Sequence, residues 1–259
     1  MTPDVGFALL LSALAGLSTT IGSLLALFVR KPGSRLMTLT LGFSGGVMIL
    51  VSFVELLPVG IDALGFAPAN LVFFAGMIAM FLIDALIPHD YMAEHHHPET
   101  ENGQQAAVRN RLLKTGLFVA LGLGIHNFPE GMASFATALS DPQLGIAIAI
   151  AIAIHNIPEG LAVSAPVYAA TGSRSKAFWW SFLSGVAEPV GALLAAVVLL
   201  PFMNDAMLGG LLSAVAGIMV FISIDELLPL SRAYGEEHLS IVGIVLGMAV
   251  MSLSLWVLK

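Results

Sequence analysis

The stretch IHNFPEG at residues 125–131 returns as IHNIPEG at residues 154–160, 29 positions later, and both copies lie inside long apolar runs. The whole chain has 259 residues, of which 58% are hydrophobic and 10% are charged, whereas soluble domains carry about 25% charged residues. Runs of about 20 apolar residues cross a hydrocarbon core about 30 Å thick. The sequence therefore predicts a single membrane-embedded domain over residues 1–259. Polar motifs inside its spans cost free energy of insertion.

Eight apolar runs, bounded by polar residues, Pro or Gly, predict eight membrane-spanning helices and an all-α fold. Helices are expected because lipid offers the backbone no other hydrogen-bond partners. The runs fall near 5–29, 37–58, 69–88, 112–138, 143–170, 177–202, 206–230 and 239–258. The first run lacks the basic leader and small-residue cleavage site of a signal peptide, so we expect it to be retained.

The basic residues predict the orientation of these spans. Nine of the ten Lys and Arg residues lie in or beside the loops after spans one, three, five and seven, and only Lys259 lies on the other side. Loops rich in Lys and Arg face the cytoplasm. We therefore expect an integral membrane protein with both termini outside the cytoplasm.

The one long loop, residues 89–110, is polar and would lie on the cytoplasmic side. It carries four histidines, His89, His95, His96 and His97. Short His-rich segments can capture metal ions, but a solvated connector explains the same composition. The sequence leaves both interpretations open.

A second internal repeat relates span two to span seven. Residues 46–58, GVMILVSFVELLP, match residues 217–229, GIMVFISIDELLP, at seven of thirteen positions. The predicted orientation makes the two spans run in opposite directions through the membrane, and such inverted repeats are typical of secondary transporters. Glu55 would lie near the outer end of its span, and Asp225 and Glu226 near the inner end of theirs. We interpret these acids as candidates for the entrance and exit of an ion path, although charges this close to water also need no special role.

The doubled motif has the chemistry of a metal site. Residues three or four positions apart share one face of a helix, so each copy gathers its polar side chains within about one turn. They are His126, Asn127 and Glu130 in the first copy, and His155, Asn156 and Glu159 in the second. Imidazole and carboxylate ligands suit Zn²⁺ and Fe²⁺, and the absence of cysteine rules out thiolate ligands. The proline of each motif frees a backbone carbonyl, which is tolerated at membrane depth where it lines a cavity.

Glu188 adds a third carboxylate at the middle of span six. An ionised side chain at the bilayer centre costs about 2.5–3.5 kcal/mol, so three would cost on the order of 10 kcal/mol. No Lys or Arg within these spans can neutralise them. Divalent cations, or protons in their place, can do so, and metal entry would then expel protons.

Simpler roles remain open for single polar residues. One His or Glu within a span is often a hydrogen-bond partner between helices, and Asp84 fits an interface or capping residue. The doubled set together with Glu188 is poorly explained in this way, so we interpret it as a metal site.

The sequence resembles the ZIP family of metal transporters, and in particular its short bacterial members, which implies that the protein lies in a bacterial inner membrane. The residues that carry the resemblance are the two HNxPEG motifs, AEPVG at 187–191 and VELLP at 54–58. The resemblance covers nearly the whole chain. It implies eight helices in which spans 1–3 and 6–8 are inverted relatives, packed around spans four and five.

The resemblance also implies a two-metal centre near the middle of the membrane, with transport directed into the cytosol. The first site would use His126, Glu130, His155 and Glu159, with Met48 nearby from span two. The second would use Asn127, Asn156 and Glu188, with Glu130 and Glu159 bridging the two ions. Some family members carry Gln where His155 stands or Asp where Asn156 stands.

We therefore predict a transporter that takes up Zn²⁺, and also Fe²⁺, Mn²⁺, Co²⁺ and Cd²⁺. Its partners would be these ions and the lipid bilayer, with no nucleic acid; a homodimer is compatible with the sequence. A metal-selective channel and, more weakly, an exporter are the alternatives. An intramembrane metalloenzyme is disfavoured because zinc proteases with an HExxH motif need a Glu beside the first His, and Asn stands there in both copies. We expect no enzymatic activity.

Overall fold

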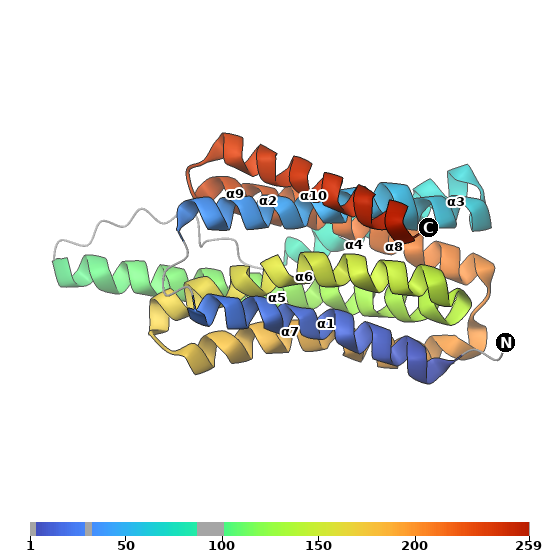
Figure 1. The fold of residues 1–259 in the computed structure, drawn as a ribbon, viewed down its shortest axis with the longest axis horizontal. Helices are drawn as coiled ribbons and strands as arrows, with labels where there is room; N and C mark the ends of the chain where they lie inside the picture. Colours follow the sequence, from blue (N-terminus) through green and yellow to red (C-terminus); the bar gives the residue numbers. More distant parts are fainter. Residues whose placement is uncertain (1–3, 29–32, 87–100, 259) are drawn as a thin grey trace.

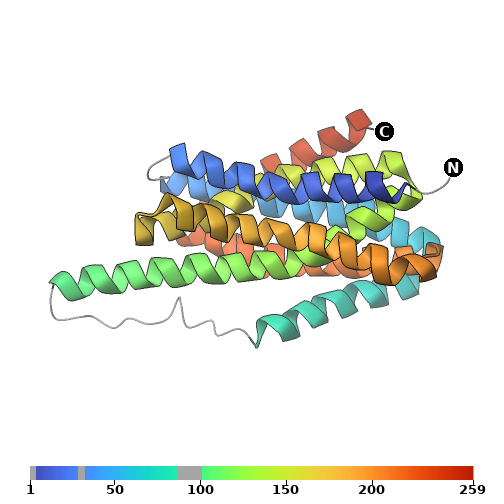
Figure 2. The same ribbon diagram turned by 90° about the horizontal axis from the view of Figure 1, so that it is seen from below.

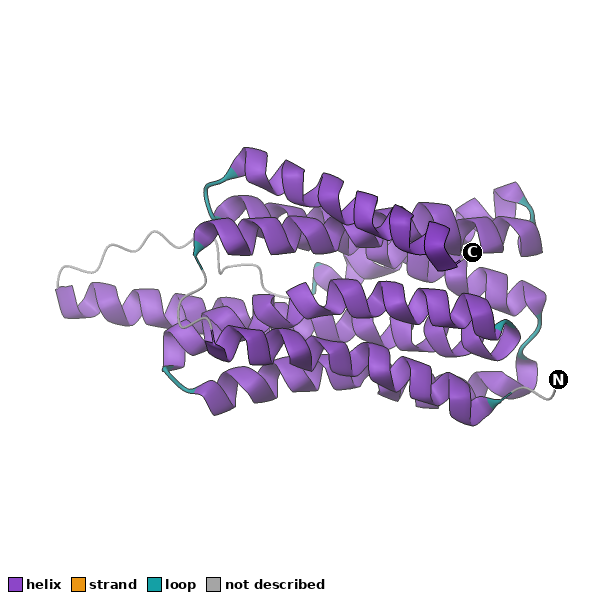
Figure 3. Ribbon diagram, in the orientation of Figure 1, coloured by secondary structure: helices purple, strands orange, loops and turns teal. Residues whose placement is uncertain are grey.

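The computed structural model describes residues 4–28, 33–86 and 101–258, and every regular element in these ranges is helical (Figure 3). The long helices are α1 (Val5–Phe28), α2 (Ser34–Val51), α4 (Phe66–Asp84), α5 (Glu101–Ser140), α6 (Pro142–Thr171), α7 (Arg174–Leu194), α8 (Asp205–Ile222) and α10 (Glu237–Leu258). Short helical elements prolong three of them without a break in the helix. They are η1 (Ser52–Leu56) and α3 (Leu57–Leu64) after α2, η2 (Ala195–Leu199) and η3 (Leu200–Phe202) after α7, and η4 (Ser223–Leu227) and α9 (Leu228–Ala233) after α8.

These helices confirm the predicted all-α membrane fold. Among the described residues, seven helical segments are long and apolar enough to cross a membrane, judged by length and composition. The eighth predicted span lies within α5. Helix ends are set by local signals: the carboxylate of Asp141 accepts hydrogen bonds from the backbone N–H groups of Gln143 and Leu144 at 2.9 and 3.1 Å, which caps α6.

Two predicted boundaries are wrong. Span two continues through Pro58 to Leu64 instead of ending at residue 58. Helix α5 begins at Glu101, so residues 101–110 are helical and do not belong to a loop. At 1.5 Å per residue, the 40 residues of α5 extend about 60 Å, twice the thickness of the hydrocarbon core. Figure 2 shows its N-terminal part extending beyond the neighbouring helices, so the spanning helix simply continues into the polar segment.

The helices form two bundles that lie side by side along the long axis of the molecule (Figure 1). We call α1, α5, α6 and α7 the first bundle, and α2, α4, α8 and α10, with α3 and α9, the second bundle. The bundles meet mainly where α2 packs on α6 and α5 packs on α8. Spans four and five, which are α5 and α6, are thus surrounded by helices of both repeats, as the resemblance implied.

The helix contacts follow the predicted inverted repeat. Exchanging α1 with α7, α2 with α8, α4 with α10 and α5 with α6 turns the α1–α6 contact into α7–α5, and the α2–α10 contact into α8–α4. All four of these contacts are extensive. The sequence match between the two repeats therefore corresponds to a match in packing.

Glycines allow the helices of the first bundle to approach closely. A Cβ atom at Gly131, the last residue of the first motif, would overlap the backbone carbonyl of Glu188 on α7. A Cβ at Gly160, the last residue of the second motif, would overlap the carbonyl of Thr19 on α1. The motif glycines are therefore required for packing, and this packing sets the spacing of the polar side chains beside them.

Candidate metal site

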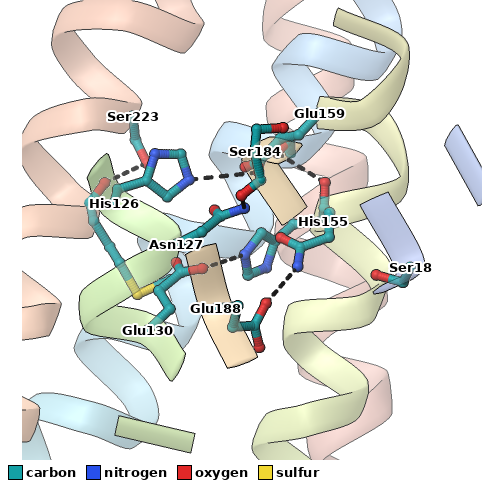
Figure 4. Close-up of polar contacts among 12 residues, drawn as sticks. Ser18, His126, Asn127, Glu130, His155, Glu159, Ser184, Glu188 and Ser223 are labelled. Atoms are coloured by element: carbon teal, nitrogen blue, oxygen red, sulfur yellow. Dashed lines mark hydrogen bonds and ion pairs between the residues drawn. The ribbon is translucent and has the colours of Figure 1, made fainter. Parts of the chain in front are cut away.

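The polar residues of the doubled motif face one another in the interior of the first bundle (Figure 4). The side chains that we predicted from it, and Glu188 with them, are at most 1% exposed. Three helices supply them: α5 carries the first motif, α6 the second, and α7 carries Glu188. Helices α5 and α6 continue as α-helices through the prolines of the motifs, Pro129 and Pro158.

The histidine of each motif pairs with the glutamate of the other. His126 Nε2 lies 3.4 Å from Glu159 Oε2, and His155 Nε2 lies 3.5 Å from Glu130 Oε2. Sequence spacing had predicted that His126 and Glu130, one turn apart on the same helix, would share an ion. The crosswise pairing instead brings both helices to one centre, because α5 and α6 pack against each other along the motifs.

Several polar side-chain atoms at this centre have no hydrogen-bond partner although they are fully buried. They are both ring nitrogens of His126, Glu130 Oε1 and Glu159 Oε2. His126 Nε2 and Glu159 Oε2 lie 3.4 Å from each other but do not form a hydrogen bond. Burying such atoms without a partner costs free energy, so buried polar atoms without hydrogen bonds are rare in native proteins. A divalent cation between the helices would satisfy them, and N and O donors of this kind are what Zn²⁺ and its neighbours accept.

Asn127, Asn156 and Glu188 form a second group beside the first. The Asn127 side-chain amide donates to the backbone carbonyl of Ser184 at 3.2 Å. The Asn156 amide donates to the carbonyl of Ala15 at 3.2 Å and to Glu188 Oε2 at 2.9 Å. These bonds fix the amides so that both Oδ1 atoms, and Glu188 Oε1, remain without partners. Three oxygen acceptors are therefore available to a cation.

The side chains are close to one another but are not gathered around a single point. Among the described residues, no group of three or more His, Asp and Glu side chains stands ready to hold an ion. Binding would therefore require rotamer changes in the side chains. Met48, predicted as a further ligand from span two, is fully buried on α2, and its role stays a prediction.

Both glutamates of the VELLP and DELLP segments lie in π-turns. Glu55 lies in η1, where it is 4% exposed, and Glu226 lies in η4. The carboxylate oxygens of Glu226 lie 2.8 Å from the point where a Cβ of Gly122 would stand, one helical turn from His126 on α5. Glu226 also interacts electrostatically with His126, with Asp84 at the end of α4, and with Asp225. The structure thus places Glu226 near the first motif, whereas Asp225 is exposed.

Sequence reasoning missed the π-turns, although a signal for them was present. Each of the three described π-turns ends on the first Leu of an LLP sequence, at 56–58, 199–201 and 227–229. In each, the N–H of the second Leu bonds to a carbonyl five residues earlier. The proline that follows cannot donate to the carbonyl four residues before it, and its ring crowds that carbonyl. Widening the turn by one residue relieves this conflict.

Sequence reasoning also missed Ser44, on α2. Its hydroxyl lies 3.2 Å from Glu159 Oε1 and 3.3 Å from the backbone carbonyl of His155. The surrounding GFSGG sequence, residues 42–46, is typical of close helix contacts, which give no indication of a polar role for Ser44. The other predicted candidates, His89, His95, His96 and His97, lie outside the described residues.

Comparisons with known proteins identify the family of the chain. A family model described as ZIP Zinc transporter matches residues 87–255. The zinc transporter ZupT of Chlorobium phaeovibrioides is 52% identical over 266 residues, which cover 98% of this chain and 99% of that protein. The proteins of the same name from Corynebacterium aurimucosum and Lysinibacillus sphaericus are 48% and 52% identical over 260 and 265 residues, covering 97% and 98% of this chain and of themselves. The chain therefore belongs to the ZIP family of zinc transporters, and it is a transporter and not an enzyme.

Proposed function

We propose that this protein carries Zn²⁺ into the cytosol through a binuclear site between α5, α6 and α7. The observation that supports this most directly is the set of buried His, Glu and Asn atoms without hydrogen-bond partners at the centre of the first bundle. The basic side chains described in the structure, such as Arg35, Arg174 and Arg232, lie near helix ends. A cation is the partner that removes the cost of burying three carboxylates here.

The two groups of side chains correspond to two ions. The first ion would be held by His126, Glu130, His155 and Glu159, with the thioether of Met48 as a further ligand. The second would be held by Asn127, Asn156 and Glu188. Glu130 and Glu159 would bridge the ions, since each carboxylate has two oxygens.

The ligand chemistry favours transport of several divalent metal ions. Imidazole, carboxylate and amide donors accept Zn²⁺, Fe²⁺, Mn²⁺, Co²⁺ and Cd²⁺, and no thiolate is present to select copper(I). Because the carboxylates must lose any bound protons before they take a metal, we propose that entry of the ion is accompanied by proton release.

We propose that both termini face the outside of the inner membrane. They lie at the same end of the molecule (Figure 1), and the connection from α6 to α7, which carries Arg174 and Lys176, lies at the opposite end. Positively charged connections face the cytoplasm. Glu55 would then lie at the outer entrance of the ion path, and Asp225 and Glu226 would lie at its inner exit.

The orientation can be tested directly because the chain has no cysteine. Asp62→Cys and Arg174→Cys place single thiols at exposed positions at opposite ends of the molecule. In intact cells, a membrane-impermeant thiol reagent is expected to label the Cys at 62, and the Cys at 174 only after the membrane is permeabilised. The reverse labelling pattern would show that the protein is inserted the other way round.

Transport kinetics test the function itself. Purified protein in proteoliposomes is expected to take up Zn²⁺ with saturable initial rates, above protein-free liposomes, and Cd²⁺, Co²⁺, Fe²⁺ and Mn²⁺ should compete. A carrier saturates because each cycle binds and releases ions at the site. Flux that rises linearly with Zn²⁺ over the range in which the site fills would instead identify a channel.

A further inference from the structure

Ser44 reaches the metal centre from the second bundle. It lies on α2, is fully buried, and its Oγ is 3.2 Å from Glu159 Oε1 and 3.3 Å from the carbonyl oxygen of His155, both on α6. The hydroxyl has one hydrogen to donate, and the carboxylate is the stronger of the two acceptors. Ser44 thus joins a predicted metal ligand to a helix outside the bundle that carries it.

The sequence around Ser44 explains how it comes so close. A Cβ at Gly42 would crowd the carbonyl of Ser240, and a Cβ at Gly46 would overlap the carbonyl of Ile244, both on α10. These glycines therefore allow one face of α2 to pack closely on α10. Ser44 follows Gly42 by two residues, a rotation of about 200°, so it faces away from α10 and toward α6. The GFSGG sequence positions a hydroxyl as well as permitting close packing.

The Ser44 hydroxyl gives the two carboxylate oxygens of Glu159 different surroundings. Oε1 faces Ser44, while Oε2 faces His126 Nε2 at 3.4 Å and has no hydrogen-bond partner. A carboxylate that is held on one oxygen presents the other in a fixed direction, and such supporting contacts commonly change metal affinity 10- to 100-fold. Glu130 differs: its Oε2 faces His155, and its Oε1 has no hydrogen-bond partner.

We propose that Ser44 is a positioning residue that orients Glu159 for the first metal site and thereby strengthens metal binding there. The inference rests on the proposed function, because it assigns Glu159 as a ligand. Because Ser44 belongs to the second bundle, the orientation of Glu159 depends on the packing of α2 against α6.

The test is a comparison of Ser44→Ala with wild type in Zn²⁺ uptake and in Zn²⁺ binding by calorimetry on the purified protein. We expect KM and Kd to rise about 10- to 100-fold, with kcat changed by less than about twofold, the pattern of lost binding without lost turnover. Ser44→Thr keeps a hydroxyl and is expected to retain values near those of wild type.

Ser164→Ala is the matched control. Ser164 is also buried in α6, but its hydroxyl donates to the carbonyl of Gly160 on its own helix at 2.6 Å. Its loss should leave KM and Kd unchanged.

The proposal would be overturned if KM and Kd of Ser44→Ala stayed within about twofold of the wild-type values. It would also be overturned if Ser44→Thr raised KM and Kd as far as Ser44→Ala does. If the Ala variant is not recovered as folded protein, the Thr variant decides in the same way. Failure of the proposed function would look different, because the wild-type protein itself would then show no saturable Zn²⁺ uptake.

Discussion

Replacing both motif histidines, as in His126→Ala/His155→Ala, is expected to weaken Zn²⁺ binding by at least about 100-fold, because even residues that only support ligands cost 10- to 100-fold. The two imidazoles are fully buried and each faces a glutamate of the other motif at 3.4 or 3.5 Å. They are the nitrogen donors that we propose for the first ion. Calorimetry on the purified variant measures the loss.

The same substitution removes the partners of two buried carboxylates, which can also destabilise the protein. His126→Gln/His155→Gln is therefore the matched control, since Gln keeps a polar side chain able to donate a hydrogen bond to Glu130 or Glu159. The Gln variant should stay folded and still bind Zn²⁺ weakly. Affinity within about twofold of wild type in a folded Ala variant would mean that the histidines are structural.

The second large effect concerns packing. Gly131→Ala is expected to destabilise the protein by about 3 kcal/mol or more, at the upper end of the usual cost of overpacking. The added Cβ would overlap the backbone carbonyl of Glu188, which cannot move without shifting α7. Because α7 carries Glu188 itself, the second metal site should be disturbed as well. A lower melting temperature in detergent, with reduced Zn²⁺ uptake, measures both consequences.

Gly124→Ala, on the same helix, is the matched control for this prediction. Its added Cβ would come no nearer than 4.0 Å to Ser184 Cα, which is ordinary contact. Alanine stabilises a helix by about 1 kcal/mol over glycine, so this variant should melt at the same temperature or higher. Equal melting temperatures for the two variants would contradict the close approach of α5 to α7.

The elements that the sequence predicted well are those encoded by local pattern. Apolar runs of about 20 residues predicted all eight helices, because length and composition decide whether a segment crosses a membrane. The match between residues 46–58 and 217–229 predicted the inverted repeat that the helix contacts confirm. The doubled motif placed the polar side chains on α5 and α6, and the structure places them together in the interior.

The features that the sequence did not predict depend on contacts between helices. Spacing along one helix suggested that His126 and Glu130 act together, but only the packing of α5 on α6 shows that His126 faces Glu159. Ser44 lies 115 residues from Glu159 in the sequence, and no pattern relates the two. The π-turn at Glu55, by contrast, follows from the local LLP sequence and could have been predicted from the missing N–H of Pro58.

The most direct test of the central claim, that ions cross the membrane through the doubled motif, is the initial rate of Zn²⁺ uptake into proteoliposomes with the internal pH recorded. Wild type should be compared with Glu130→Gln/Glu159→Gln, which keeps size and hydrogen bonding while removing both charges. We expect saturable Zn²⁺ uptake with a change of internal pH in wild type, and neither uptake nor a pH change in the folded variant. Equal uptake by the two proteins would contradict it, because the ion would then be crossing the membrane elsewhere.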